Sequence, residues 1–151
     1  MLQNKKRMVT YFMIAIFCVA ADRFFKAMSL LFFQNEEVVL SSFLKFNFTR
    51  NYNIAFSIPL FSKLILVVVP VILLFLILYF IISAEKGKID LAGLLMIISF
   101  CAASNYYDRL RYGFVIDYFD IKWFTVLNLA DIAIVMSTFI ILIFYNKLMI
   151  K

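Results

Sequence analysis

Four long apolar stretches dominate the chain and alternate with shorter polar segments. Each is close to the ~20 residues that an α-helix needs to cross the hydrocarbon core of a bilayer. The pattern therefore predicts helices at about residues 8–33, 62–83, 90–108 and 124–146. The first stretch begins like a secretory signal peptide, but its apolar character resumes after Asp22, so we expect a retained membrane helix.

A different pattern occupies the first long polar segment, at about residues 36–60. From Phe43 to Phe48 apolar and polar side chains roughly alternate, and a period of two is typical of a strand. Open sheet edges cannot lie in lipid, so such a sheet must sit at the membrane surface or pack on protein. We therefore expect an α-helical membrane protein with four transmembrane helices and a small extracytoplasmic β-sheet on the first outer loop, in a single domain over residues 1–151.

The basic residues indicate the orientation. Lys5, Lys6 and Arg7 precede the first apolar stretch, and cytoplasmic segments of membrane proteins are enriched in Lys and Arg. With four spans, both termini would lie in the cytoplasm. The segments 34–60 and 109–122 would then lie together on the outer side.

Composition favours the bilayer as the solvent and excludes several classes of protein. The chain is 66% hydrophobic with a mean hydropathy of +0.99, whereas soluble domains are ~45–50% apolar. The net charge of +6 comes without a sustained basic block, so we expect membrane phospholipids and no nucleic acid as partners. The chain has no His, which excludes Ser-His and Cys-His nucleophile pairs and His-based zinc sites. Cys18 and Cys101 both lie in apolar stretches and indicate no disulfide framework.

The candidate chemistry concentrates between residues 105 and 131, which hold four of the six Asp residues. This stretch connects the end of the third expected helix to the start of the fourth, so its acids can converge at one membrane face. Carboxylates at the edge of hydrocarbon are unfavourable and usually functional. Two Asn-x-x-Asp pairs place amide donors beside carboxylates, although a helix cap is the simpler interpretation of either residue in the second pair. The four acids are Asp108, Asp117, Asp120 and Asp131.

A charged pair lies near the far end of the first expected helix. Asp22 and Lys26 are four residues apart, on one helix face, with the acid N-terminal to the base. Spacing alone leaves two interpretations open. The pair either neutralises itself to ease burial, or fixes a carboxylate and an ammonium that face a site.

Taken in order, these motifs resemble the lipoprotein signal peptidase (signal peptidase II) family. The resemblance covers most of the chain, including the four spans and the long first outer loop. Any one motif is weak, but the whole set in this order is specific. The matching residues are Asp22 and Lys26, then Asn51, Ala55 and Phe56, then Asn105, Asp108, Arg109, Gly113 and Asp117, and finally Asn128, Ala130 and Asp131.

The resemblance implies an aspartic endopeptidase of the bacterial cytoplasmic (inner) membrane. Such an enzyme removes the signal peptide from a diacylglyceryl prolipoprotein substrate and cuts just before the lipidated Cys. The resemblance assigns catalysis to Asp117 and Asp131, whereas the sequence pattern by itself does not separate Asp117 from Asp108. We expect no cofactor, no metal and a monomer. The supporting residues would be Asp22, Lys26, Asn51, Asn105, Asp108, Arg109 and Asn128.

Three positions depart from the family pattern. Asn53 stands where the family usually has Gly, and 100–104 replaces a Gly-rich approach to the third motif, which would change how closely the third helix packs. A Phe-Pro-x-Phe entry to the fourth helix appears here as residues 124–127. The two catalytic aspartates, Asp117 and Asp131 (the dyad), and their Asn partners are intact, so we expect activity to persist. We expect the substrate range and the fit of inhibitors to change.

Three alternatives remain open at the level of sequence. A small transporter or proton relay would use Asp22, Lys26 and Asp131 along a path, and would place acids at several depths. A Ser-Lys peptidase would pair Lys26 with Ser29, three residues further on. A catalytically silent paralogue would keep the fold without the activity.

Overall fold

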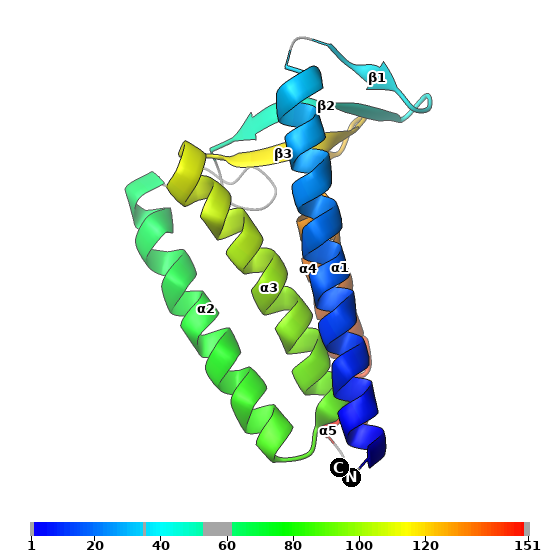
Figure 1. The fold of residues 1–151 in the computed structure, drawn as a ribbon, viewed down its shortest axis with the longest axis vertical. Coiled ribbons are helices and arrows are strands. Elements are labelled where there is room, and N and C mark those ends of the chain that lie inside the picture. Colours follow the sequence, from blue (N-terminus) through cyan, green and yellow to red (C-terminus); the bar gives the residue numbers. More distant parts are fainter. Residues whose placement is uncertain (1, 35, 53–61, 150–151) are drawn as a thin grey trace.

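The computed structural model describes residues 2–34, 36–52 and 62–149. Its long helices run alongside one another, a small sheet covers one end of them, and the start of α1 and α5 lie at the other end (Figure 1). The helices are α1 Leu2–Phe32, α2 Ser62–Glu85, α3 Ile89–Tyr112, α4 Leu129–Ile143 and α5 Tyr145–Met149.

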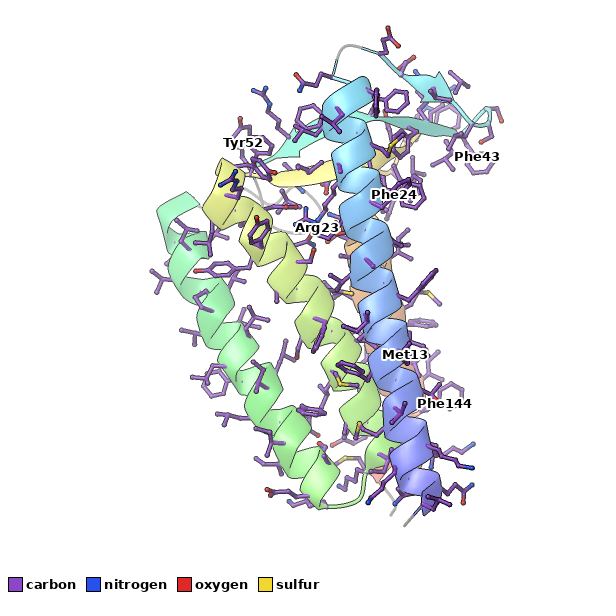
Figure 2. The ribbon with its side chains drawn as sticks, in the orientation of Figure 1. Met13, Arg23, Phe24, Phe43, Tyr52 and Phe144 are labelled. Atoms are coloured by element: carbon purple, nitrogen blue, oxygen red, sulfur yellow. The ribbon has the colours of Figure 1, made fainter. Side chains whose placement is uncertain are left out.

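Several of these helices suit a membrane by length and composition. α1, α3 and the part of α2 from Leu64 to Glu85 are each long and apolar enough to span one, while α4 is apolar but shorter, with 15 residues. Large hydrophobic side chains project outward, as Met13, Phe24 and Phe144 show in Figure 2. An outer surface this apolar is suited to contact with lipid.

α3 is the central helix and packs against α1, α2 and α4. Residues 91–99 are buried along its first half, whereas few residues of α2 are buried. Gly93 allows α1 to approach closely, because a Cβ added there would overlap the ring of Tyr11. A small buried cluster holds α1, α3 and α4 together further along, and consists of Ala15, Ile97, Cys101 and Ala130.

The sheet is antiparallel and has the order β1-β2-β3-β4. Its central strands β2 and β3 shift register between Phe46 and Thr49, so the pairing there is irregular. β1 and β2 come before α2 in the sequence, and β3 and β4 come after α3. The strands are β1 Val38–Val39, β2 Leu44–Asn51, β3 Val115–Ile121 and β4 Thr125–Leu127.

The predicted small sheet is therefore present in the segment between α1 and α2, but the prediction was incomplete. The segment 109–122, expected to be a plain loop, supplies β3, and β4 follows it directly. β3 is rich in β-branched and aromatic residues, as strands usually are. Its two acids, Asp117 and Asp120, interrupt the apolar pattern, so the strand was not recognised from the sequence.

The helix boundaries also differ from the prediction. α1 begins at Leu2, so Lys5–Arg7 lie within the helix and not before it. α4 begins at Leu129 and not near residue 124, because β4 and a turn occupy that stretch. Trp123, in this turn, has a positive φ of 63°. The predictions for Asn53, Ala55 and Phe56 lie outside the described residues.

Candidate active site

Five charged residues meet where the sheet joins the helix ends. Asp117 lies on β3, Asp131 in the first turn of α4, and Asp108 near the end of α3. Asp22 and Lys26 reach the same place from α1. All are fully buried except Asp131, which is partly buried. In Figure 1 this region lies just below β3.

Two Asn amides hold Asp117 within this cluster. Asn51 Nδ2 donates to Asp117 Oδ2 at 2.8 Å, and Asn128 Nδ2 donates to Asp117 Oδ1 at 2.6 Å. Burial, and after it the negative charge of Asp131, raises the pKa of Asp117 to about 7. The two amide hydrogen bonds stabilise the carboxylate and oppose that rise. Asp117 can therefore bind or release a proton near neutral pH.

Asn128 connects Asp117 to Asp131. Asn128 Oδ1 accepts from the Asp131 backbone N–H at 2.9 Å, and Asp131 Oδ2 accepts from the Asn128 backbone N–H at 3.4 Å. This pair of bonds is a capping box at the start of α4. The helix-cap interpretation of these residues is thus confirmed. The cap does more than begin the helix, however, because the Asn128 side chain also donates to Asp117.

Asn105 links Asp131 to Lys26. Asn105 Nδ2 donates to Asp131 Oδ1 at 2.8 Å, while Asn105 Oδ1 accepts from Lys26 Nζ at 2.6 Å and from Asn128 Nδ2 at 3.2 Å. The orientation of this amide is fixed, because its oxygen faces two donors and its nitrogen faces a carboxylate. One side chain therefore sets the position of Asp131 relative to both neighbours.

Lys26 lies between two buried carboxylates. Its Nζ is 2.8 Å from Asp22 Oδ2 and 2.8 Å from Asp108 Oδ2. Arg23 adds a second cation, with Nη2 2.5 Å from Asp108 Oδ1. Two cations thus balance two acids, and buried charges persist when they are paired and hydrogen-bonded. The Asp22–Lys26 pair is part of the cluster, and not an isolated surface pair.

Tyr118, Ser104 and Arg23 also contact the cluster, although their part in it was not predicted from the sequence. Tyr118 is fully buried on β3, and its hydroxyl donates to Asp22 Oδ1 at 3.1 Å and accepts from the Leu129 backbone N–H at 2.9 Å. Ser104 Oγ donates to Asp22 Oδ2 at 3.2 Å. Tyr118 follows Asp117 on the strand, so the two point to opposite faces of the sheet. The position of Tyr118 could be inferred from this alternation only if residues 115–121 had been recognised as a strand.

A cavity of about 130 Å³ lies beside Asp131. Asn51, Asn105 and Arg109 also line it, and Arg109 Nη1 contacts the Asn105 carbonyl oxygen at 3.5 Å. A water molecule needs roughly 10–15 Å³, so the space is large enough to hold water. The apolar walls come from Val69, Ala102, Val115 and Ile134.

The nine catalytic and supporting residues that the resemblance implies meet in this cluster or line its cavity. Two further candidates, Asp120 from the acid-rich stretch and Ser29 from the Ser-Lys alternative, do not join it. Asp120, the fourth acid of the 105–131 stretch, instead accepts from Asn47 Nδ2 at 3.4 Å. Ser29 Oγ donates to the Asn47 carbonyl oxygen at 3.2 Å, and Lys26 is held by acids. The described part of the chain has no group of three or more Asp, Glu or Cys side chains that could hold a metal ion.

The architecture matches that of solved bacterial membrane enzymes. One, described as a bacterial membrane enzyme structure by the in meso method at 2.3 Å resolution, has a TM-score of 0.80 and 24% identity, and covers 91% of this chain and 88% of that chain. A second, at 1.9 Å resolution, has a TM-score of 0.78 and 23% identity, with 91% and 93% covered. At these identities the likeness shows the fold. The fold and its apolar helices define a bacterial multi-pass membrane protein.

The sequence comparisons define the family. The profile described as Signal peptidase (SPase) II matches residues 14–147. The lipoprotein signal peptidase of Moorella thermoacetica is 32% identical over 135 residues, which cover 87% of this chain and 89% of that protein. Those of Clostridium novyi and Wigglesworthia glossinidia brevipalpis are 31% and 36% identical, and cover 87% and 76% of this chain and 94% and 78% of their own. The chain belongs to the signal peptidase II family.

Proposed function

We propose that this chain is an aspartic endopeptidase that removes the signal peptide from diacylglyceryl-modified prolipoproteins and cuts before the lipidated Cys. The observation that carries the proposal is the placement of Asp117 and Asp131 on two segments, both bound by Asn128. A helix cap alone requires no second buried acid. The names of the relatives, lipoprotein signal peptidases, supply the substrate class.

The two aspartates act as a pair that shares one proton. Two carboxylates that repel each other electrostatically cannot both ionise readily, and the raised pKa of Asp117, to which the charge of Asp131 contributes, is consistent with a proton held there near neutrality. The ionised member takes a proton from a water molecule, whose oxygen attacks the scissile carbonyl carbon. The protonated member donates to the carbonyl oxygen as the tetrahedral intermediate forms. The intermediate then collapses and the C–N bond breaks. The leaving nitrogen of the lipidated Cys takes the proton that the first aspartate removed from water, and the second aspartate recovers a proton from a hydroxyl of the intermediate as the new carboxyl group forms.

The cavity beside Asp131 is the place for that water. Asp131 faces it directly, and Asn51 brings the amide that binds Asp117 to the same space. The Arg109 guanidinium, which also lines the cavity, can stabilise negative charge on the carbonyl oxygen or bind a lipid phosphate.

The buried charges behind the dyad act as positioning residues. Lys26 contacts Asp22, Asp108 and Asn105, and Asn105 in turn fixes Asp131. Asp131 therefore keeps one orientation when substrate binds. The ion pairs of Lys26 and Arg23 with Asp22 and Asp108 also keep the charge near the dyad balanced.

The substrate would approach along the sheet at the outer membrane surface. An extended peptide can add to a sheet as a further strand, and its diacylglyceryl group would remain in the lipid beside the helices. In the proposed topology four helices span the cytoplasmic membrane, α4 continuing towards α5, with both termini in the cytoplasm. The enzyme acts as a monomer of one domain, because the cluster is complete within one chain.

The test is cleavage of a purified prolipoprotein by the purified chain in detergent. Substrates with and without the diacylglyceryl group on the Cys are compared, and the products are identified by mass spectrometry. We expect a new N-terminus at the lipidated Cys, and much slower cleavage of the unmodified precursor. Equal rates for the two substrates would overturn the lipid requirement, and no cleavage of either would favour a catalytically silent paralogue. Cleavage abolished by Ser29→Ala would favour the Ser-Lys alternative.

A further inference from the structure

A second and larger cavity, of about 410 Å³, lies at the end of the helices opposite the aspartates. Residues from the start of α1, the start of α3 and the α4–α5 region line it. Asp90 at this end and Asp108 at the other end of α3 are about 27 Å apart at ~1.5 Å per residue. The volume falls in the roughly 300–1,000 Å³ range of small-molecule sites.

The lining of this cavity carries excess positive charge. Arg7, Lys88 and Lys147 face one carboxylate, Asp90, so three positive charges and one negative leave +2. Arg7 is ion-paired with Asp90, which also accepts from the Tyr11 hydroxyl at 3.2 Å. Within the described ranges neither lysine has a carboxylate at ion-pair distance. The two lysines are therefore available to an anion.

The remaining contacts of Lys88 do not neutralise it. Its Nζ lies 3.4 Å from the Met149 sulfur, and a thioether is only a weak acceptor. Lys147 is exposed on α5, one turn from Phe144. Because Arg7 is held by Asp90, the guanidinium is fixed at the cavity wall and adds a third donor group.

The other walls of the cavity are apolar and continue onto the lipid-facing surface. Leu94 is buried on α3, whereas Ile140 and Phe144 are 36% and 48% exposed. Phe144 points outward near the lower end of the helices in Figure 2. A small soluble anion would use only the cations. A ligand with an anionic head and a hydrocarbon tail would use both parts.

We propose that this cavity binds the headgroup of an anionic phospholipid. Lys88 and Lys147 contact the phosphate, and an acyl chain lies along Ile140 and Phe144. Basic pockets between transmembrane helices suit anionic lipids on the cytoplasmic side, which is where the proposed topology places this end. The binding itself does not depend on the catalytic proposal. A bound lipid would link α1, α3 and α5 and so stabilise the fold.

Native mass spectrometry of the purified full chain in detergent tests this. Phosphatidylglycerol or phosphatidylcholine is added, and the fraction of protein that retains lipid is measured. We expect retention of phosphatidylglycerol, and roughly 25-fold weaker binding for Lys88→Gln/Lys147→Gln, at about fivefold per lysine. The control Lys6→Gln/Lys86→Gln removes the same charge from the same end but not from the lining, and should bind normally.

Thermal unfolding gives a second readout. Phosphatidylglycerol should raise the Tm of the native chain and the control, and should not raise that of Lys88→Gln/Lys147→Gln. If that variant folds poorly, Lys88→Arg/Lys147→Arg should bind normally, because it keeps both charges. Equal retention of phosphatidylcholine, or unchanged binding by the Gln variant, would overturn the proposal. Displacement by inorganic phosphate at a concentration comparable to the lipid's would mean a free-anion site, and would also overturn it.

Discussion

At the scale of single residues, the raised pKa of Asp117 has a measurable consequence for stability. Its pKa is about 7 in the folded protein, and about 3.9 is usual for Asp in an unfolded chain. Between these values the folded state holds a proton that the unfolded state has released. Stability should therefore be fullest below pH 4 for this group, and should fall as pH rises through 7.

Asp117→Asn removes that proton equilibrium. We expect the Tm of the native chain in detergent to fall more steeply between pH 5 and pH 8 than the Tm of the variant. Asp120→Asn is the matched control, because Asp120 lies on the same strand outside the cluster. Parallel curves for the native chain and Asp117→Asn would contradict the assignment of a raised pKa.

Single residues were predictable where spacing along one helix sufficed. Asp22 with Lys26 follows from helical spacing, and Asn128 with Asp131 follows from the capping pattern. Asn105 was expected beside Asp108, but its amide donates to Asp131. Arg23 and Tyr118 were not predictable in this way. They reach the cluster by tertiary contacts, Arg23 to Asp108 on α3 and Tyr118 to Asp22 on α1.

At the scale of elements, the contact between α1 and α3 depends on Gly93. Ala is favoured over Gly within a helix by roughly 0.5–1 kcal/mol. Overlap with a packed side chain costs about 1–3 kcal/mol, so overlap should win. The Tyr11 ring cannot move freely, since its hydroxyl binds Asp90. Gly93→Ala should therefore lower stability by up to about 2 kcal/mol.

Thermal unfolding of Gly93→Ala checks this, with Gly93→Ala/Tyr11→Ala as the partner variant. Removing the ring removes the overlap, so Gly93→Ala should destabilise far less in the Tyr11→Ala background. A higher Tm for Gly93→Ala alone would show that helix propensity, and not the close approach, dominates at this position.

The helices followed from apolar length, whereas the strands followed only in part. Residues 44–51 alternate visibly, and β2 is there. β3 was not predicted, because Asp117 and Asp120 interrupt its apolar pattern. β4 is short and follows another apolar segment, so it was counted as part of the helix, and the start of α4 was placed too early. An apolar count cannot separate β4 from the helix that follows, whereas the Asn128 cap marks that boundary.

At the scale of the whole molecule, the two ends of the helices differ in chemistry. The sheet end holds the buried acid cluster, and the other end holds the basic cavity. Glu37 lies at the sheet end and Lys86 in the turn between α2 and α3 at the other end (Figure 1). The proposed orientation places the sheet on the outer side of the cytoplasmic membrane and the basic end in the cytoplasm.

Cysteine-accessibility labelling in whole cells tests that orientation. Glu37→Cys and Lys86→Cys are made separately in a Cys18→Ala/Cys101→Ala background, which must keep activity. A membrane-impermeant maleimide should label the Glu37→Cys chain in intact cells, and the Lys86→Cys chain only after lysis. Labelling of both in intact cells would contradict the proposed topology.

The central claim is that Asp117 and Asp131 form one catalytic unit, and single-turnover cleavage of the diacylglyceryl substrate by Asn variants tests it most directly. Positioned proton transfer contributes roughly 10²–10⁴ in rate. Asp117→Asn and Asp131→Asn should each lose at least about 100-fold while still folded, and the double variant should lose little more than either single one. Asp120→Asn should cleave at the native rate. Near-native cleavage by well-folded Asp117→Asn, together with loss of cleavage in well-folded Asp108→Asn, would contradict the account.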